Sequence, residues 1–81
     1  MITVYSKDNC PQCLQVESLL KMKGKTYEVK KLDKDYTRED LDAVFEAAGT
    51  PVARSFPMVF KDGAFVGTLN EVKLAVVKGT L

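Results

Sequence analysis

Ile2-Thr3-Val4-Tyr5 opens the chain, and Cys10-Pro11-Gln12-Cys13 follows after a short connection. The first stretch is short, apolar and rich in β-branched and aromatic residues, which favours a buried strand. Proline is common at the first position of a helix, so Pro11 predicts a helix that begins between the two cysteines and runs to about Lys23. A strand, a C-x-x-C and a helix in this order are typical of a dithiol redox site.

The two cysteines are the only ones in the chain, so they must act as a pair. Side chains three residues apart on a helix are neighbours, and their separation is compatible with a disulfide. A purely structural disulfide is the weaker interpretation, because closing so short a loop restricts the unfolded chain very little. We expect Cys10 at the exposed start of the helix and Cys13 one turn further in, facing the core.

Length and composition narrow the classes of protein. The chain has 81 residues, and its 46% of hydrophobic residues are enough for the core of one domain spanning 1–81. The twelve basic and eleven acidic residues leave a net charge of +1, which gives no electrostatic footprint for nucleic acid. Neither a secretory signal nor a run of about 20 apolar residues is visible. We therefore expect a cytoplasmic monomer that binds neither nucleic acid nor membrane.

Hydrophobic periodicity predicts an alternation of strands and helices. The expected strands are 2–5, 27–32, 58–60 and 64–66, and the expected helices are 11–23, 38–48 and 71–78. Asp62-Gly63 marks a hairpin turn between the last two strands. The order β-α-β-α-β-β-α predicts an α/β protein of thioredoxin-like fold, with a four-stranded mixed sheet covered by three helices.

Several residues mark the expected helix ends. Gly24 and Gly49 follow the last apolar positions of the first two helices, where glycine commonly ends a helix. Thr37 precedes acidic residues and is the expected N-cap of the second helix. Asn70 is the expected N-cap of the third helix.

The position of the pair predicts different tasks for its two sulfurs. A thiolate is the attacking species, and a helix N-terminus favours it through unpaired N–H groups and the helix dipole. Lys7 could add positive charge, although Asp8 opposes it. Cys10 would attack a substrate disulfide, and Cys13 would then attack Cys10 and release the reduced substrate. Gln12 is the variable position that adjusts potential or partner choice.

Metal binding is the main chemical alternative. Structural zinc requires four ligands, whereas this chain offers two cysteines and no histidine. A metal would have to be shared between two chains, so we expect no metal site. A non-enzymatic binding module of this fold that carries a metal or an iron–sulfur cluster remains the alternative of another class.

Four stretches carry a family resemblance. They are Val4-Tyr5-Ser6-Lys7, Cys10-Pro11-Gln12-Cys13, Arg54-Ser55-Phe56-Pro57-Met58-Val59-Phe60, and Asp62-Gly63 followed by Val66-Gly67. Together they resemble glutaredoxins of the short form found in bacteria and phages. The resemblance implies a thiol-disulfide oxidoreductase that binds no cofactor and uses glutathione as co-substrate. Its implied partners are glutathione and disulfide-containing proteins, with ribonucleotide reductase among them.

The resemblance also implies the substrate site. By analogy with glutaredoxins, Phe56-Pro57 is a cis peptide beside the cysteines. The residues implied in binding substrate or glutathione are Lys7, Gln12, Ser55, Phe56, Pro57, Gly67, Thr68 and Asn70. Several of them depart from the family pattern: Ser55-Phe56 stand where Thr-Val is usual, Gln12 replaces an aromatic residue, Thr68 replaces a glycine and Asn70 replaces an acid. An amide lacks the charge that a carboxylate would bring to an ammonium group.

These departures leave a second family open. The opening Met1-Ile2-Thr3-Val4-Tyr5 and the glutamine before Cys13 are similar to the NrdH-redoxins. Those proteins are reduced by thioredoxin reductase and serve ribonucleotide reductase. Their characteristic tryptophan-containing stretch is absent, since this chain has no tryptophan. The resemblance to glutaredoxin therefore takes precedence.

Overall fold

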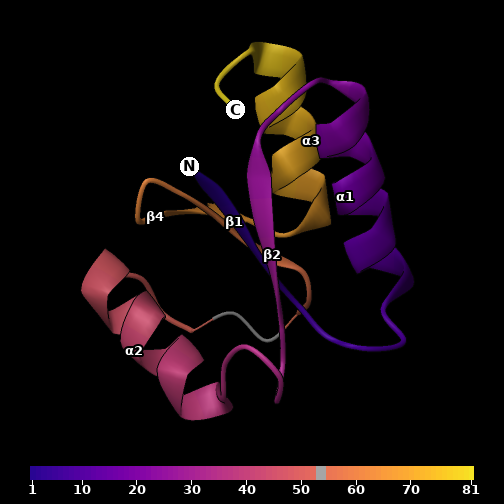
Figure 1. Cartoon of the computed structure of the whole chain (residues 1–81). Coiled ribbons are helices and arrows are strands. Elements are labelled where there is room, and N and C mark those ends of the chain that lie inside the picture. Colours follow the sequence, from indigo (N-terminus) through magenta and orange to yellow (C-terminus); the bar gives the residue numbers. More distant parts are fainter. Residues whose placement is uncertain (53–54) are drawn as a thin grey trace.

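A computed structural model describes residues 1–52 and 55–81, so Arg54 of the family-like stretch lies outside the described residues. Strands and helices follow one another in the predicted order (Figure 1). They are β1 (Ile2–Ser6), α1 (Pro11–Met22), β2 (Tyr27–Lys31), α2 (Arg38–Ala48), β3 (Met58–Lys61), β4 (Ala64–Gly67) and α3 (Leu69–Lys78). Strands β1, β3 and β4 are each one residue longer than predicted, and β2 is one residue shorter.

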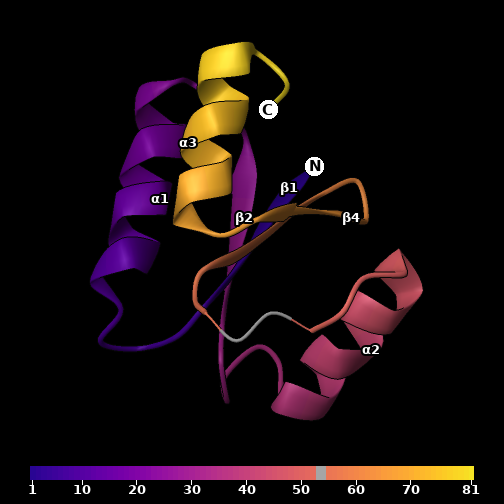
Figure 2. The ribbon, with the colours of Figure 1, turned by 180° about the vertical axis from the view of Figure 1, so that it is seen from behind.

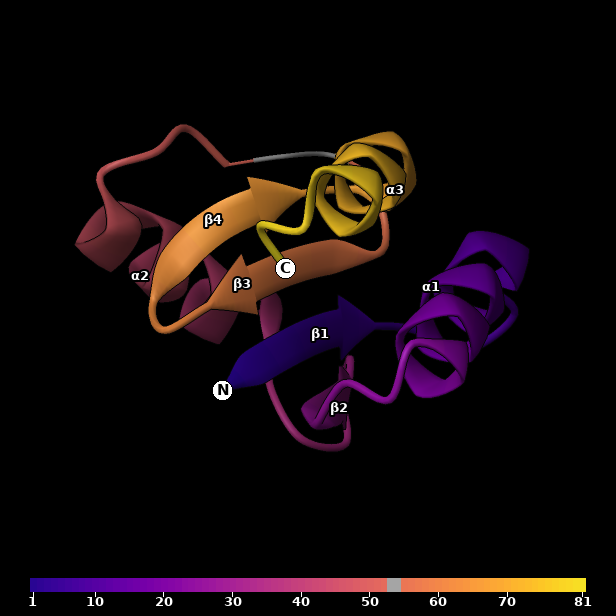
Figure 3. The same ribbon diagram turned by 90° about the horizontal axis from the view of Figure 1, so that it is seen from above.

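The four strands form one mixed sheet in the order β2-β1-β3-β4, which Figure 3 shows from above. Strand β1 pairs in parallel with β2, with Val4 opposite Val29, and antiparallel with β3, with Val4 opposite Val59. The parallel pair needs a crossover, which α1 supplies. The tight Asp62-Gly63 connection makes β3 and β4 an antiparallel hairpin. This is the predicted thioredoxin-like arrangement.

The helices cover both faces of the sheet. Figures 1 and 2 show α1 and α3 side by side on one face and α2 on the other. Each face has its own apolar cluster. The cluster under α1 and α3 contains Ile2, Val4, Val16, Leu20, Val59, Val72 and Leu81. The cluster under α2 contains Tyr5, Tyr36, Leu41, Phe45, Met58 and Phe60. Because neighbouring strand residues point to opposite faces, β1 and β3 each contribute to both clusters.

The predicted ends of α1 and α2 are confirmed closely. Pro11 occupies the first position of α1, and Gly24 adopts a positive φ of 68° just beyond its end. Thr37 is the N-cap of α2: its hydroxyl accepts from the N–H of Asp40, and the Asp40 carboxylate accepts from the N–H of Thr37. Gly49 ends α2 in the left-handed conformation.

The predicted start of α3 is wrong. The helix begins at Leu69, its N-cap is Thr68, and Asn70 lies inside the first turn. The physical reason is Glu71, whose Oε1 accepts from both the N–H and the hydroxyl of Thr68. An acid three residues after a threonine can reach back in this way and draws the helix start to the threonine. Within the described ranges, no helix combines the length and apolar character that crossing a membrane requires.

Candidate active site

Cys10 is the N-cap of α1. Its backbone is extended, with φ −122° and ψ 94°, and its carbonyl accepts the first helical hydrogen bond from Leu14 at 3.3 Å. The loop from β1 reaches it through Asn9, which has a positive φ of 56°. Asparagine tolerates this left-handed conformation better than most residues do. The sequence therefore places Cys10 at the point where the chain turns from strand into helix.

Cys10 and Cys13 are joined in a disulfide, with their Cα atoms 5.3 Å apart. The backbone N–H of Cys13 donates to the Sγ of Cys10 across 3.2 Å. In the reduced protein, this donor and the positive end of the α1 dipole face the Cys10 sulfur, and both favour its thiolate form. The geometry thus supports Cys10 as the attacking sulfur.

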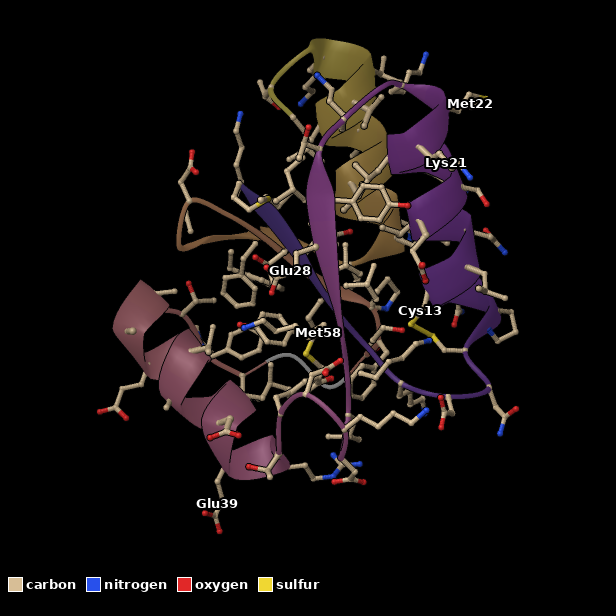
Figure 4. The ribbon with its side chains drawn as sticks, viewed as in Figure 1. Cys13, Lys21, Met22, Glu28, Glu39 and Met58 are labelled. Carbon is tan, nitrogen blue, oxygen red and sulfur yellow. A yellow bond between two sulfur atoms is a disulfide. The ribbon has the colours of Figure 1, made fainter. Side chains whose placement is uncertain are left out.

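The two sulfurs differ in access, although less than the sequence suggests. Cys10 is 7% exposed and Cys13 is 1% exposed. The prediction that Cys10 lies at the exposed start of the helix is wrong for its side chain, which is buried among the residues around it, and only the order of exposure holds. Figure 4 shows Cys13 and its disulfide at the lower end of α1, on the side of the helix that faces the sheet. Access to the disulfide is therefore through Cys10.

The predicted cis peptide between Phe56 and Pro57 is present. It lies immediately before β3, the strand that pairs antiparallel with β1. Pro57 is fully buried, whereas Phe56 is half-buried and lines the surface beside Cys10. The Ser55-Phe56 segment therefore forms a wall opposite the start of α1.

Two adjacent hollows open beside the disulfide. The first has a volume of about 280 Å³ and is lined by Lys7, Asn9, Cys10, Pro11, Gln12, Ser55 and Phe56. The second has a volume of about 230 Å³ and is lined by Gln12, Ser55, Phe56, Thr68, Leu69 and Asn70. Gln12, Ser55 and Phe56 line both, so the hollows form one continuous depression that leads from Cys10 to the start of α3.

This depression brings together most of the residues that the resemblance implied. Lys7 lies at one end, with its Nζ 5.3 Å from the centre of the Phe56 ring, within cation–π range. Thr68 and Asn70 lie at the other end. Gly67 and Pro57 are buried, and neither is among the described residues that line the two hollows. A side chain at Gly67 would overlap the Cβ and Cγ of Glu71, so the glycine leaves room for the α3 start.

A group of polar contacts that was not predicted fixes the end of β1. Ser6 is fully buried, its carbonyl accepts from the Tyr36 hydroxyl at 2.8 Å, and its Oγ lies 3.5 Å from the Lys31 Nζ. Burial raises the pKa of Tyr36 to about 12. Nearby Tyr5 and Asp33 also raise this pKa, whereas Arg38 lowers it. The only sequence signal was the alternation of β1, which puts Ser6 on the same face as Val4.

No three acidic, histidine or cysteine side chains gather to form a metal site in the part of the chain that the structure describes. The site consists of a disulfide at a helix N-terminus, beside a polar depression on a thioredoxin-like fold. Those features define a thioredoxin-fold protein with a redox-active dithiol.

Comparison with known proteins gives the family. A sequence model of glutaredoxin matches residues 2–66, and the chain belongs to the glutaredoxin family, a family of thiol-disulfide oxidoreductases. Glutaredoxin-C6 of rice (Oryza sativa subsp. japonica) is 34% identical over 71 residues, which cover 86% of this chain and 61% of the rice protein. The chain therefore spans less than two thirds of that curated relative.

Solved structures agree with this assignment. Oxidized glutaredoxin 2 of Chlamydomonas reinhardtii is 32% identical, with a TM-score of 0.70 over 99% of this chain and 74% of that one. A buckwheat glutaredoxin–glutathione complex is 27% identical, with a TM-score of 0.77 over 99% of this chain and 71% of that one. This chain thus has the same thioredoxin-like fold as these glutaredoxins.

Proposed function

We propose that the chain is a glutathione-dependent dithiol-disulfide oxidoreductase that reduces protein disulfides and glutathione mixed disulfides in the cytoplasm. The observation that carries the proposal is the position of Cys10, which is the N-cap of α1 and lines a polar depression. A buried structural disulfide would need no such depression. The solved complex of a buckwheat glutaredoxin with glutathione supports this choice of co-substrate.

The reaction starts from the reduced pair. The Cys10 thiolate attacks one sulfur of a substrate disulfide, and the other sulfur leaves as a thiol. Cys13 then attacks the Cys10 sulfur of the mixed disulfide, which releases the second substrate thiol and forms Cys10–Cys13. Two molecules of glutathione restore the dithiol and leave as glutathione disulfide. The 1% exposure of Cys13 limits it to the second attack.

The depression suits an extended tripeptide thiol. With the glutathione sulfur at Cys10, one carboxylate lies near Lys7, and the γ-glutamyl end extends past Phe56 toward Thr68 and Asn70. The charge of Lys7 favours a carboxylate at that end. At the other end the Glu71 carboxylate is already bound to Thr68, so Asn70 is the polar side chain that remains for the γ-glutamyl group.

The function is tested by asking which reducing system supplies electrons to the protein. The protein is incubated with NADPH, an excess of a protein disulfide as electron acceptor, and either glutathione plus glutathione reductase or thioredoxin reductase alone. We expect turnover with the glutathione system. Turnover only with thioredoxin reductase would contradict the proposal and favour the NrdH-type alternative, which Thr68 and Asn70 motivate. Visible absorbance in the freshly purified protein would instead indicate an iron–sulfur carrier. Ribonucleotide reductase is the protein disulfide to try first, on the strength of the family resemblance.

The direction of glutathione along the depression can be tested separately. Asn70→Asp places a carboxylate at the α3 end, where it would meet the γ-glutamyl ammonium. We expect the KM for glutathione to fall by roughly threefold to tenfold, the gain of a charge-assisted hydrogen bond. Asn9→Asp is the matched control at the opposite end, and we expect it to raise the KM. The reverse pattern would show that the tripeptide runs the other way.

A further inference from the structure

The mechanism proposed above gives no role to Glu17, a residue of α1 with a buried carboxylate oxygen. The side chain is half-buried, and its Oε2 atom is buried without a hydrogen-bond partner among the described residues. It makes no ion pair within the described part of the chain. A carboxylate oxygen that is withdrawn from water without a partner is unfavourable, so such groups are rare unless they have a chemical task.

The helix places Glu17 next to Cys13. The two residues are four apart on α1, where side chains are neighbours, and helical side chains lean toward the preceding turn. Figure 4 labels Cys13 and Lys21, which lie one turn before and one turn after Glu17. Helix geometry therefore directs the Glu17 side chain toward the turn of α1 that holds Cys13.

The oxidised state explains why the carboxylate lacks a partner. In the Cys10–Cys13 disulfide, Cys13 has no proton to donate. In the reduced protein, Cys13 is a thiol, and the 1% exposure of this residue prevents it from passing its proton directly to bulk water. A carboxylate with one buried oxygen, one turn away on α1, can then accept both the hydrogen bond and the proton.

We propose that Glu17 is the general base for Cys13 in the second step of the reaction. The Glu17 carboxylate takes the proton from the Cys13 thiol. The resulting thiolate attacks the Cys10 sulfur of the mixed disulfide, the Cys10–Cys13 bond forms and the bond to the substrate sulfur breaks. The departing substrate thiolate takes a proton from solvent, and the protonated Glu17 releases its proton to solvent, which regenerates the carboxylate. The role of Glu17 rests on the dithiol mechanism proposed above.

Other charged or titratable side chains lie on this side of the sheet with Glu17. Strand β2 contributes Lys31, bound at Ser6, and the half-buried Tyr27, which packs on the cluster under α1 and α3. Helix α1 itself contributes Lys21, and α3 contributes Lys73, which lines a separate groove on the outer side of α1. Helix α3 also carries the carboxylate of Glu71, but its Oε1 already accepts from Thr68. Glu17 is therefore the carboxylate of this group with a buried oxygen that has no partner among the described residues.

The test separates the two sulfurs by stopped flow. The reduced protein is mixed with 5,5′-dithiobis(2-nitrobenzoate), and two molecules of coloured thiol are released in turn. The first release reports the attack by Cys10 and depends on reagent concentration, whereas the second reports the attack by Cys13 and does not. For Glu17→Gln we expect an unchanged first rate and a second rate about 100-fold lower at pH 7, a typical contribution of a general base. The deficit should shrink above pH of about 8.5, where thiols ionise unaided.

A control variant shows whether the effect belongs to Glu17 and not to the loss of any carboxylate. Glu39→Gln removes an exposed carboxylate that Figure 4 shows on α2, far from Cys13, and should leave both rates unchanged. A normal second rate in Glu17→Gln, an equal loss in both phases, or a deficit that is the same at every pH would overturn the proposal.

The wild-type protein supplies a second measurement that does not depend on the folding of a variant. With a general base on the protein, the second rate should stay nearly constant between about pH 6 and about pH 8, because the Cys13 thiol then gives its proton to the protein and not to solvent. A rate that instead falls about tenfold per pH unit below pH 8 would overturn the role of Glu17, since it would show attack by thiolate formed in solvent equilibrium. Neither measurement uses glutathione, so a failure of the proposed glutathione dependence would be seen separately.

Discussion

The backbone N–H of Cys13 donates to the Sγ of Cys10 across 3.2 Å, so a sulfur caps the first turn of α1. An N-cap side chain normally offers an oxygen, and neutral sulfur is a weak acceptor by comparison. A thiolate is a much better acceptor, because hydrogen bonds to charged groups are shorter and stronger. The same contact that caps the helix therefore becomes stronger when Cys10 ionises.

The first prediction concerns this difference between the sulfurs. When the reduced protein is treated with less than one equivalent of iodoacetamide at pH 7, we expect alkylation of Cys10 over Cys13 by at least about tenfold. Cys10 lines the depression and receives the N–H of Cys13, whereas Cys13 is almost completely buried. Peptide mass spectrometry locates the label. Equal labelling of the two residues would contradict the assignment of Cys10 as the attacking sulfur.

The second prediction separates the two halves of the mechanism. Cys13→Ser should keep activity on small glutathione mixed disulfides, because a second glutathione can take the place of Cys13. The same variant should lose most of its activity on protein disulfides, which need the internal attack on Cys10. Cys10→Ser should lose both activities. The measurement compares a glutathione mixed disulfide with a protein disulfide, and an equal loss on both in Cys13→Ser would refute the division of tasks.

The third prediction concerns Gly67, at the junction of β4 and α3. A Cβ at this position would overlap the Cβ and Cγ of Glu71, and the backbone φ of +142° is unfavourable for other residues. Gly24→Ala is the matched control, since Gly24 also has a positive φ but open space around it. We expect the control to lose about 1 kcal/mol of unfolding free energy.

Gly67→Ala should lose about 1–3 kcal/mol more than that control, because the added methyl forces Glu71 away from Thr68. Urea unfolding measures both variants. If they proved equally stable, the close packing of Gly67 against Glu71 would have no energetic importance.

The fourth prediction concerns Tyr36, whose hydroxyl donates a hydrogen bond to the carbonyl of Ser6. Burial raises the pKa of Tyr36 from 10.0 to about 12, so the folded state binds the phenol proton more tightly than the unfolded state. The stability that follows is complete below pH 10 and is lost as the pH rises toward 12. Urea unfolding between pH 9 and pH 12 should therefore show a decline in the wild-type protein that Tyr36→Phe lacks.

At neutral pH, Tyr36→Phe should lose about 1–2 kcal/mol, because the buried Ser6 carbonyl loses its donor. Tyr27→Phe serves as the control for tyrosine titration in general, since Tyr27 is only half-buried. An unchanged pH dependence in Tyr36→Phe would mean that another group causes the alkaline loss of stability.

Most of the fold was predictable because strong local signals agreed with one another. Pro11, Gly24, Thr37 and Gly49 each mark a helix end, and all four mark the observed ends to within one residue. The start of α3 was predicted two residues too late, with Asn70 as N-cap, because the prediction did not include the reach of Glu71 back to Thr68. The spacing from Thr68 to Glu71 was present in the sequence, and weighing it would have placed the start of α3 correctly.

The residues of the site were predictable, but the burial and the contacts of their side chains were not. Spacing placed Cys10 and Cys13 at a helix start, and the family resemblance placed Phe56 and Pro57 beside them. The low exposure of Cys10, the buried oxygen of Glu17 and the bonds to Ser6 depend on loops and strands that meet only in the folded chain. Periodicity describes each element alone, so it contains no information about such contacts between elements.

Gln12, Ser55 and Phe56 line both hollows, the one at the disulfide and the one at the start of α3. A redesign of the protein for another thiol therefore cannot treat the two ends as independent modules. Any substitution at these three positions that improves the fit of one end also reshapes the other. Separate adjustment is left to the outer residues, Lys7 and Asn9 at one end and Thr68 and Asn70 at the other.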